Sequence, residues 1–86
     1  MDLQLAGLRA VVTGGSAGIG AAIVRVLASE GCNVAFCART QARIDATLRS
    51  VGSLPGPVCA RALDVTDNGR VKDWFESLGS FDIFIP

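Results

Sequence analysis

A stretch with four glycines, VVTGGSAGIGAAI at residues 11–23, constrains the fold of this chain more than any other feature. The glycines follow a short valine-rich run at residues 8–13, which is typical of a β-strand. From Gly18 onward the apolar residues take the spacing of a helix. Glycine lets a chain turn sharply and approach other groups closely, because it has no side chain. The chain is therefore expected to begin with a strand, a tight turn and a helix.

The alternation of strand and helix continues to the end of the chain. Residues 33–38 form a continuous apolar run, as expected of a strand that is covered on both faces. Residues 58–63 and 81–86 are predicted as further strands, although Arg61 interrupts the first of them. Three helices are predicted between the strands from apolar residues at helical spacing: Ile19, Ile23, Val26 and Leu27; Ile44, Leu48 and Val51; Val71, Trp74, Phe75 and Leu78.

Three further residues are expected to mark helix ends. Gly31 is placed to end the first helix, and Thr40 and Thr66 are placed to cap the starts of the second and third. The resulting order, β-α-β-α-β-α-β with helix-length connections, predicts an α/β fold with a parallel sheet and helices on both faces. Trp74 and Phe75 fit this fold as core residues rather than as an aromatic binding stripe.

The composition argues against several classes of function. The 86 residues carry eight basic and eight acidic side chains, so no net charge favours nucleic acid or an anionic membrane surface. We expect no signal peptide and no membrane span, because no apolar stretch has the required length or flanks. Histidine is absent and Cys32, Cys37 and Cys59 lack the spacing of a metal site. We therefore expect no metal, and three buried thiols in a reducing cytoplasm.

The glycine turn lies where a strand passes into a helix, which is the place of the phosphate-binding turn in dinucleotide-binding folds. Gly14 would allow the sharp turn, Gly18 a close approach to a pyrophosphate, and Gly20 tight packing of the helix on the sheet. Free N–H groups and the helix dipole favour an anion at this point. The spacing is not GxGxxG, and no Lys-Ser or Lys-Thr follows as in a P-loop. A plain tight turn is the alternative.

The sequence TGGSAGIG at residues 13–20 resembles the TGxxxGIG fingerprint of the short-chain dehydrogenase/reductase family. The resemblance covers all 86 residues and includes ART after the second predicted strand and DVTD after the third. It implies a Rossmann-like doubly wound parallel sheet, of which residues 1–86 form the first β-α-β-α-β-α-β portion, the N-terminal dinucleotide-binding part of a single domain. It also implies that five residues line the pyrophosphate and ribose, with Ala17 as a further cofactor-binding residue of the same turn: Gly14, Ser16, Gly18, Ile19 and Gly20.

The resemblance also assigns residues after the third predicted strand. Asp64 would accept a hydrogen bond from the adenine amino group, and Val65 would pack beside the adenine ring. The alternative for Asp64 is a negative charge at the start of the third helix, next to Thr66.

The residues after the second predicted strand favour NADP over NAD. NAD-binding folds place an acid about twenty residues past the glycines, where it binds the ribose 2′-OH, but here Ala38 and Arg39 occupy that place. A guanidinium suits a 2′-phosphate, and Ser16 and Thr40 could assist it. Related NADP-binding chains often carry a basic residue before the middle glycine, where this chain has Ala17. The alternative for Arg39 is a solvated residue at a helix start.

The resemblance implies an NAD(P)-dependent oxidoreductase that transfers hydride between the cofactor and a small carbonyl or alcohol, acting as a homo-oligomer in the cytoplasm. Its catalytic Ser and Tyr-x-x-x-Lys would lie beyond Pro86. The chain contains no tyrosine, so no catalytic residue is assigned. Because the last predicted strand has no outer partner, we expect these residues to be the first part of a longer chain that covers it, with coverage by a second chain as the alternative. The alternatives are a non-catalytic dinucleotide-binding module and, with poorer fit, a methyltransferase that uses an adenosyl cofactor.

Overall fold

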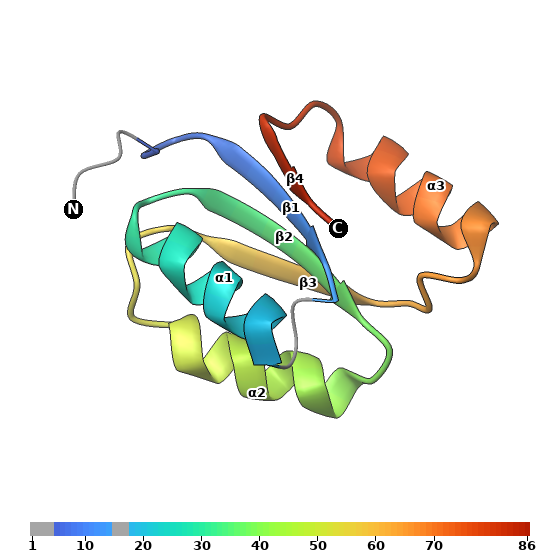
Figure 1. Cartoon of the computed structure of the whole chain (residues 1–86), viewed down its shortest axis with the longest axis horizontal. Helices are drawn as coiled ribbons and strands as arrows, with labels where there is room; N and C mark the ends of the chain where they lie inside the picture. Colours follow the sequence, from blue (N-terminus) through green and yellow to red (C-terminus); the bar gives the residue numbers. More distant parts are fainter. Residues whose placement is uncertain (1–4, 15–17) are drawn as a thin grey trace.

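A computed structural model of the chain describes residues 5–14 and 18–86. Strands and helices alternate along it from the blue end of the ribbon to the red end (Figure 1). The elements are β1 (Arg9–Thr13), α1 (Gly18–Ser29), β2 (Asn33–Ala38), α2 (Gln41–Val51), β3 (Val58–Ala62), α3 (Asn68–Leu78) and β4 (Ile83–Ile85). This order confirms the predicted α/β alternation, with the last strand shorter than expected.

The four strands form one parallel sheet in the order β3-β2-β1-β4. Thr13 at the end of β1 lies opposite Cys37 in β2, and Ala38 lies opposite Ala62 in β3. The carboxyl ends of these strands therefore meet at one edge of the sheet. The chain winds outward from β1 to β3 and then returns to the other side of β1 for β4. In open sheets of this kind, ligands bind beyond the carboxyl ends at such a reversal.

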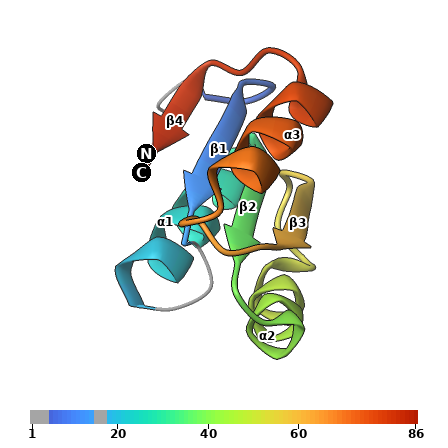
Figure 2. The same ribbon diagram turned by 90° about the vertical axis from the view of Figure 1, so that its right-hand side faces the viewer.

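Helices cover both faces of the sheet, as predicted for a doubly wound fold. Figure 2 shows α3 in front of the sheet and α1 behind it. The core on the side of α1 and α2 joins apolar residues of these helices to β1 and β2: Ala10, Val12, Val24, Leu27, Ala28, Cys32, Val34, Phe36, Ala38, Ile44 and Val51. The smaller core under α3 contains Val11, Ala35, Cys37, Leu63 and Trp74. Trp74 is 3% exposed, which confirms it as a core residue.

The end of α1 is set by Gly31, as predicted. Gly31 has φ +87°, a conformation that glycine adopts at little cost. The N–H of Cys32 donates to the carbonyl of Leu27 at 3.1 Å, and the N–H of Gly31 donates to that of Ala28 at 3.1 Å. This pair of bonds is the Schellman arrangement, which satisfies the last carbonyls of the helix and directs the chain into β2.

The buried face of α1 differs from the predicted stripe. Ile19 and Val26 are 80% and 55% exposed, whereas Val24, Leu27 and Ala28 are buried. Leu27 of the predicted stripe is buried and Ile23 packs against the core, but Val24 and Ala28 are buried in place of Ile19 and Val26. The exposure of Cys59 also differs from the prediction, because β3 is an edge strand, while Cys32 and Cys37 are buried as expected.

The start of α3 is capped by Asp67 and not by Thr66. The Asp67 carboxylate accepts a hydrogen bond from the N–H of Arg70 at 3.2 Å, and the helix begins at Asn68. Thr66 turns its hydroxyl back toward Asp64 instead. Thr40 caps α2 as predicted, because its Oγ1 accepts from the N–H of Arg43.

Loss of the Asp67 cap should destabilise the protein measurably. We expect Asp67→Ala to lower the free energy of unfolding by about 1 kcal/mol, because an N–H at the start of α3 loses its acceptor. Urea unfolding of the full chain measures the change, with Thr66→Ala as the comparison. A larger loss in Thr66→Ala than in Asp67→Ala would contradict this assignment of the cap.

Candidate functional site

The glycine turn begins directly after β1. Gly14 has φ +73° and Gly18, the first residue of α1, has φ +56°, values that residues with a side chain rarely adopt. The N–H of Gly14 donates to the carbonyl of Cys37 at 3.1 Å, which fixes the start of the turn to the end of β2. An added Cβ at Gly14 or Gly18 would meet no described atom within 4 Å. The two glycines are thus required by the backbone conformation, and none of the described residues fills the space beside them.

Of the other predicted residues of the turn, the structure describes Ile19 and Gly20. Ser16 and Ala17 lie outside the described residues, so the structure does not test their predicted contacts. Ile19 is 80% exposed at the first turn of α1. Gly20 is half-buried in the same turn. The large apolar side chain of Ile19 is thus available in solvent to contact a ligand.

A cleft of about 490 Å³ opens at the carboxyl ends of the strands, next to the glycine turn. It brings together three of the predicted site residues, Gly14, Arg39 and Val65, which are far apart in the sequence. Val65 is 47% exposed there. The remaining lining residues are Cys37, Ala38, Thr40, Arg43 and Leu63. The cleft therefore combines an apolar floor with two guanidinium groups.

The sequence reasoning missed Arg43. This residue is the third of α2 and comes three residues after the cap, Thr40, so the helix start places it beside Arg39. Both arginine side chains are exposed, and among the described residues neither forms an ion pair with a carboxylate. The spacing Thr40-x-x-Arg43 could have indicated that Arg43 lies near Arg39, because an N-cap and the third helical residue lie on the same turn.

Asp64 lies in the turn after β3, between the cleft residues Leu63 and Val65. Its Oδ1 accepts hydrogen bonds from the backbone N–H of Thr66 at 2.9 Å and from the Thr66 hydroxyl at 2.8 Å. These bonds, with a smaller contribution from the positive charge of Arg39, lower the pKa of the Asp64 carboxyl. Asp64 is therefore a carboxylate at neutral pH. Its predicted contact with adenine remains a prediction.

Cys37 lines the cleft but is a poor candidate for a nucleophile. The side chain is buried, and burial raises the pKa of its thiol. A neutral thiol is weakly nucleophilic. Cys37 thus serves the cleft as an apolar wall, as its place in the core under α3 indicates.

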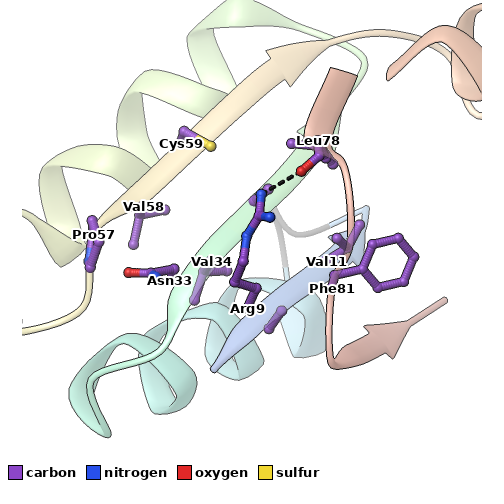
Figure 3. Close-up of a pocket in the computed structure, with 11 residues that line it drawn as sticks. Arg9, Val11, Asn33, Val34, Pro57, Val58, Cys59, Leu78 and Phe81 are labelled. Atoms are coloured by element: carbon purple, nitrogen blue, oxygen red, sulfur yellow. Dashed lines mark hydrogen bonds between the residues drawn. The ribbon is translucent and has the colours of Figure 1, made fainter. Parts of the chain in front are cut away.

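A second hollow lies at the opposite, amino-terminal edge of the sheet (Figure 3). It is smaller, about 170 Å³, and its walls include Val34, Val58 and Phe81. The side chain of Arg9 crosses it, and its Nη2 donates to the backbone carbonyl of Leu78. Because ligands of such sheets bind at the carboxyl ends of the strands, we do not assign the dinucleotide to this hollow.

Comparison with known proteins identifies the family. The model of the short chain dehydrogenase family matches residues 9–85, which is nearly the whole chain. The chain belongs to the short-chain dehydrogenase/reductase family. Within the described part of the chain, no helix is long and apolar enough to cross a membrane.

Curated members of the short-chain dehydrogenase/reductase family resemble this chain over most of its length. It is 40% identical to a 3-oxoacyl-(acyl-carrier-protein) reductase of Chlamydia pneumoniae over 73 residues, which are 85% of this chain and 29% of the relative. It is 36% identical to an L-xylulose reductase of Bos taurus over 85 residues, which are 99% of this chain and 33% of the relative. The chain therefore spans about a third of the length of these curated relatives.

Solved structures of the short-chain dehydrogenase/reductase family share the fold. The L-sorbose reductase of Gluconobacter frateurii, solved with NADPH and L-sorbose, superposes with a TM-score of 0.82 and is 34% identical. That alignment covers 98% of this chain and 34% of the reductase. A short-chain dehydrogenase/reductase of Mycobacterium marinum superposes with a TM-score of 0.84 at 30% identity, over 93% of this chain and 34% of the other. The family and the Rossmann-like sheet are thereby confirmed.

Proposed function

We propose that this chain binds NADP(H) and supplies the cofactor-binding part of an oxidoreductase that transfers hydride between the nicotinamide and a small carbonyl or alcohol. The observation that carries the proposal is the cleft at the carboxyl ends of β1, β2 and β3, which Gly14 at the start of the glycine turn and Arg39 line together. The family membership supports an NAD(P)-dependent oxidoreductase, and the NADPH in the L-sorbose reductase structure supports the choice of cofactor.

The glycine turn would hold the pyrophosphate. The first N–H groups of α1 have no partner within the helix, and the helix dipole favours negative charge at this end. Gly14 and Gly18 have no side chain that would fill the space beside the turn. Ser16, Ala17, Ile19 and Gly20 would complete this contact and line the adjoining ribose, as the family resemblance implies.

The far side of the cleft would hold the adenosine. Val65 offers an exposed apolar surface to the adenine ring. The Asp64 Oδ1 is already engaged by Thr66, which leaves Oδ2 to accept from the adenine amino group. The lowered pKa of Asp64 keeps this group an acceptor at neutral pH. Thr66 would therefore position the carboxylate that the adenine meets.

Arg39 would select the phosphorylated cofactor. It is exposed in the cleft directly after β2, where NAD-binding folds place an acid. A guanidinium can form two parallel charge-assisted hydrogen bonds with a phosphate. Asp45, the nearest acid in the sequence, accepts a hydrogen bond from the Gln41 side chain at 2.8 Å within α2. The arrangement favours NADP over NAD.

The bound nicotinamide supplies the hydride chemistry, and this chain's own residues bind and orient the cofactor. No residue of the chain is assigned to proton transfer or to polarising the substrate. We also propose a homo-oligomer in the cytoplasm, with neither a membrane nor a nucleic acid as partner. The identity of the carbonyl or alcohol is left open.

A dinucleotide-binding module without catalysis is the second candidate. The oxidoreductases among its relatives do not favour this module, and the family's catalytic tyrosine and lysine would in any case lie beyond residue 86. The single lysine of the sequence, Lys72, is exposed on α3. A methyltransferase that uses an adenosyl cofactor fits less well, because Arg39 would then have no phosphate to bind.

Consumption of NADPH distinguishes the enzyme from the module. We expect the protein, in a form that includes the family's Ser and Tyr-x-x-x-Lys, to oxidise NADPH when it is offered small aldehydes, ketones, ketoses and 3-oxoacyl thioesters, and to do so more slowly with NADH. The loss of NADPH absorbance measures the rate. Tight binding of NADPH without turnover on any of these compounds would favour the module instead.

A further inference from the structure

Arg43 lines the cleft together with Arg39, and the proposed function gives it no role. We propose that Arg43 is a second cation for the 2′-phosphate and that it helps to set the preference for NADP(H) over NAD(H). This inference rests on the proposed binding of a dinucleotide in the cleft, and it concerns the side chain that discriminates between the two cofactors.

The position of Arg43 is set by the start of α2. Its backbone N–H donates to Oγ1 of the cap residue Thr40 at 3.4 Å, so the Arg43 side chain leaves the helix in its first turn. Together with Arg39 and Thr40, it lines the cleft of about 490 Å³. Three donors are thereby gathered at one place: two guanidinium groups and a hydroxyl. Because the Thr40 oxygen accepts from Arg43, its hydroxyl proton stays available to donate to an anion.

The charges around Arg43 leave it available for a ligand. Among the described residues, no carboxylate forms an ion pair with Arg39 or Arg43. Asp45, one turn from Gln41 on the same helix, is bonded to the Gln41 side chain at 2.8 Å. The Asp64 carboxylate is held by Thr66 and interacts with Arg39 only as a smaller electrostatic effect. The acids near the cleft therefore leave both guanidinium groups without an ion-pair partner.

The negative charge of the 2′-phosphate is larger than one guanidinium group can neutralise. A phosphate monoester carries a charge of about −1.5 to −2 at neutral pH and presents three acceptor oxygens. A single guanidinium would leave part of that charge uncompensated, and the glycine turn contributes no basic side chain because Ala17 stands before its middle glycine. Arg43 supplies the missing positive charge from α2. Arg43 would not increase the affinity for NADH, because NADH lacks the 2′-phosphate.

The test compares binding of phosphorylated and unphosphorylated ligands to the full chain. We expect Arg43→Ala to raise the dissociation constant of NADPH about tenfold, as the loss of a charge-assisted hydrogen bond would do, and to leave that of NADH unchanged. Adenosine 2′,5′-bisphosphate and adenosine 5′-monophosphate should show the same contrast. Arg49→Ala is the matched control, because Arg49 is exposed in the last turn of the same helix and carries the same charge.

The outcomes distinguish a direct contact between Arg43 and the 2′-phosphate from a general effect of positive charge on the affinity. Equal weakening of NADPH and NADH by Arg43→Ala, or the same NADPH loss in Arg49→Ala, would overturn the assignment of Arg43 to the phosphate. An unchanged NADPH preference in Arg43→Ala would also overturn it, while leaving the proposed function in place. If the unmodified chain bound neither dinucleotide, both the proposed function and this inference would fall. Partial recovery of NADPH binding in Arg43→Lys would support the role of the charge.

Discussion

Replacing Arg39 with aspartate is expected to weaken NADPH binding by about 100-fold and to leave NADH bound as tightly as before or more tightly. The exchange removes charge-assisted hydrogen bonds of about 1.5–3 kcal/mol each and adds a carboxylate that repels the 2′-phosphate. A 100-fold change corresponds to about 2.7 kcal/mol. The new carboxylate can also accept from the ribose 2′-OH, as in NAD-binding folds. Titration of the full chain with each dinucleotide measures both constants.

The control for this exchange removes the same charge elsewhere. Arg25 is exposed on α1 and does not line the cleft. Arg25→Asp should change the affinities for NADPH and NADH little and equally. If Arg39→Asp left NADPH affinity unchanged, the assignment of Arg39 to the phosphate would be wrong, and Arg39 would be a solvated residue at the start of a helix.

The second large effect concerns stability and arises at Gly56. This residue is buried in the connection between α2 and β3, and its N–H donates to the carbonyl of Ala28 at 2.8 Å. An added Cβ would lie 2.1 Å from the carbonyl oxygen of Cys32 and 2.9 Å from that of Ala28. Both contacts are with backbone, so no change of side-chain rotamer relieves them. We expect Gly56→Ala to lower the free energy of unfolding by about 3 kcal/mol or more.

Gly52 offers a matched comparison in the same connection. Its backbone is helical, with φ −63° and ψ −23°, and an added Cβ would come no nearer than 3.6 Å to another residue. Gly52→Ala should therefore be neutral or stabilise the protein by about 0.5 kcal/mol, since alanine restricts the unfolded chain. Urea unfolding of both variants measures the contrast. Equal stability of Gly56→Ala and Gly52→Ala would show that the connection does not pack against the end of α1 as described.

The order of elements could be predicted from the sequence because the local signals agreed. Apolar runs of strand length alternated with helical spacing, and Gly31 and Thr40 stood at helix ends where their chemistry is favoured. The glycine turn was recognisable for the same reason. Its positive φ values at Gly14 and Gly18 require glycine whatever the ligand.

Three predictions from the sequence were wrong for local physical reasons: the cap of α3, the buried face of α1 and the burial of Cys59. Thr66 and Asp67 are both good cap residues, and the sequence does not show that Asp64 would engage Thr66 and leave the cap to Asp67. The stripe of α1 was misjudged because Ile19 and Val26 were weighted by hydrophobicity. Val24 and Ala28 are buried instead. The exposure of Cys59 depends on β3 being an edge strand, which only the strand order reveals.

The sequence motifs predicted single residues of the candidate site, but they did not predict the cleft that these residues form together. Gly14, Arg39 and Val65 come from three separate connections, and the parallel register brings them to one edge of the sheet. Arg43 was missed because its contribution depends on the direction of the first turn of α2. A basic residue three positions after an N-cap is common on solvated helices, so its sequence position alone assigns it no ligand.

Binding of NADPH and NADH to the full chain, measured by calorimetry, tests the central claim most directly. The two cofactors differ only in the 2′-phosphate that the Arg39 side of the cleft would hold. We expect both to bind at one site and NADPH to bind at least about tenfold more tightly, as one charge-assisted phosphate contact would require. Failure to bind either dinucleotide, or tighter binding of NADH, would contradict it.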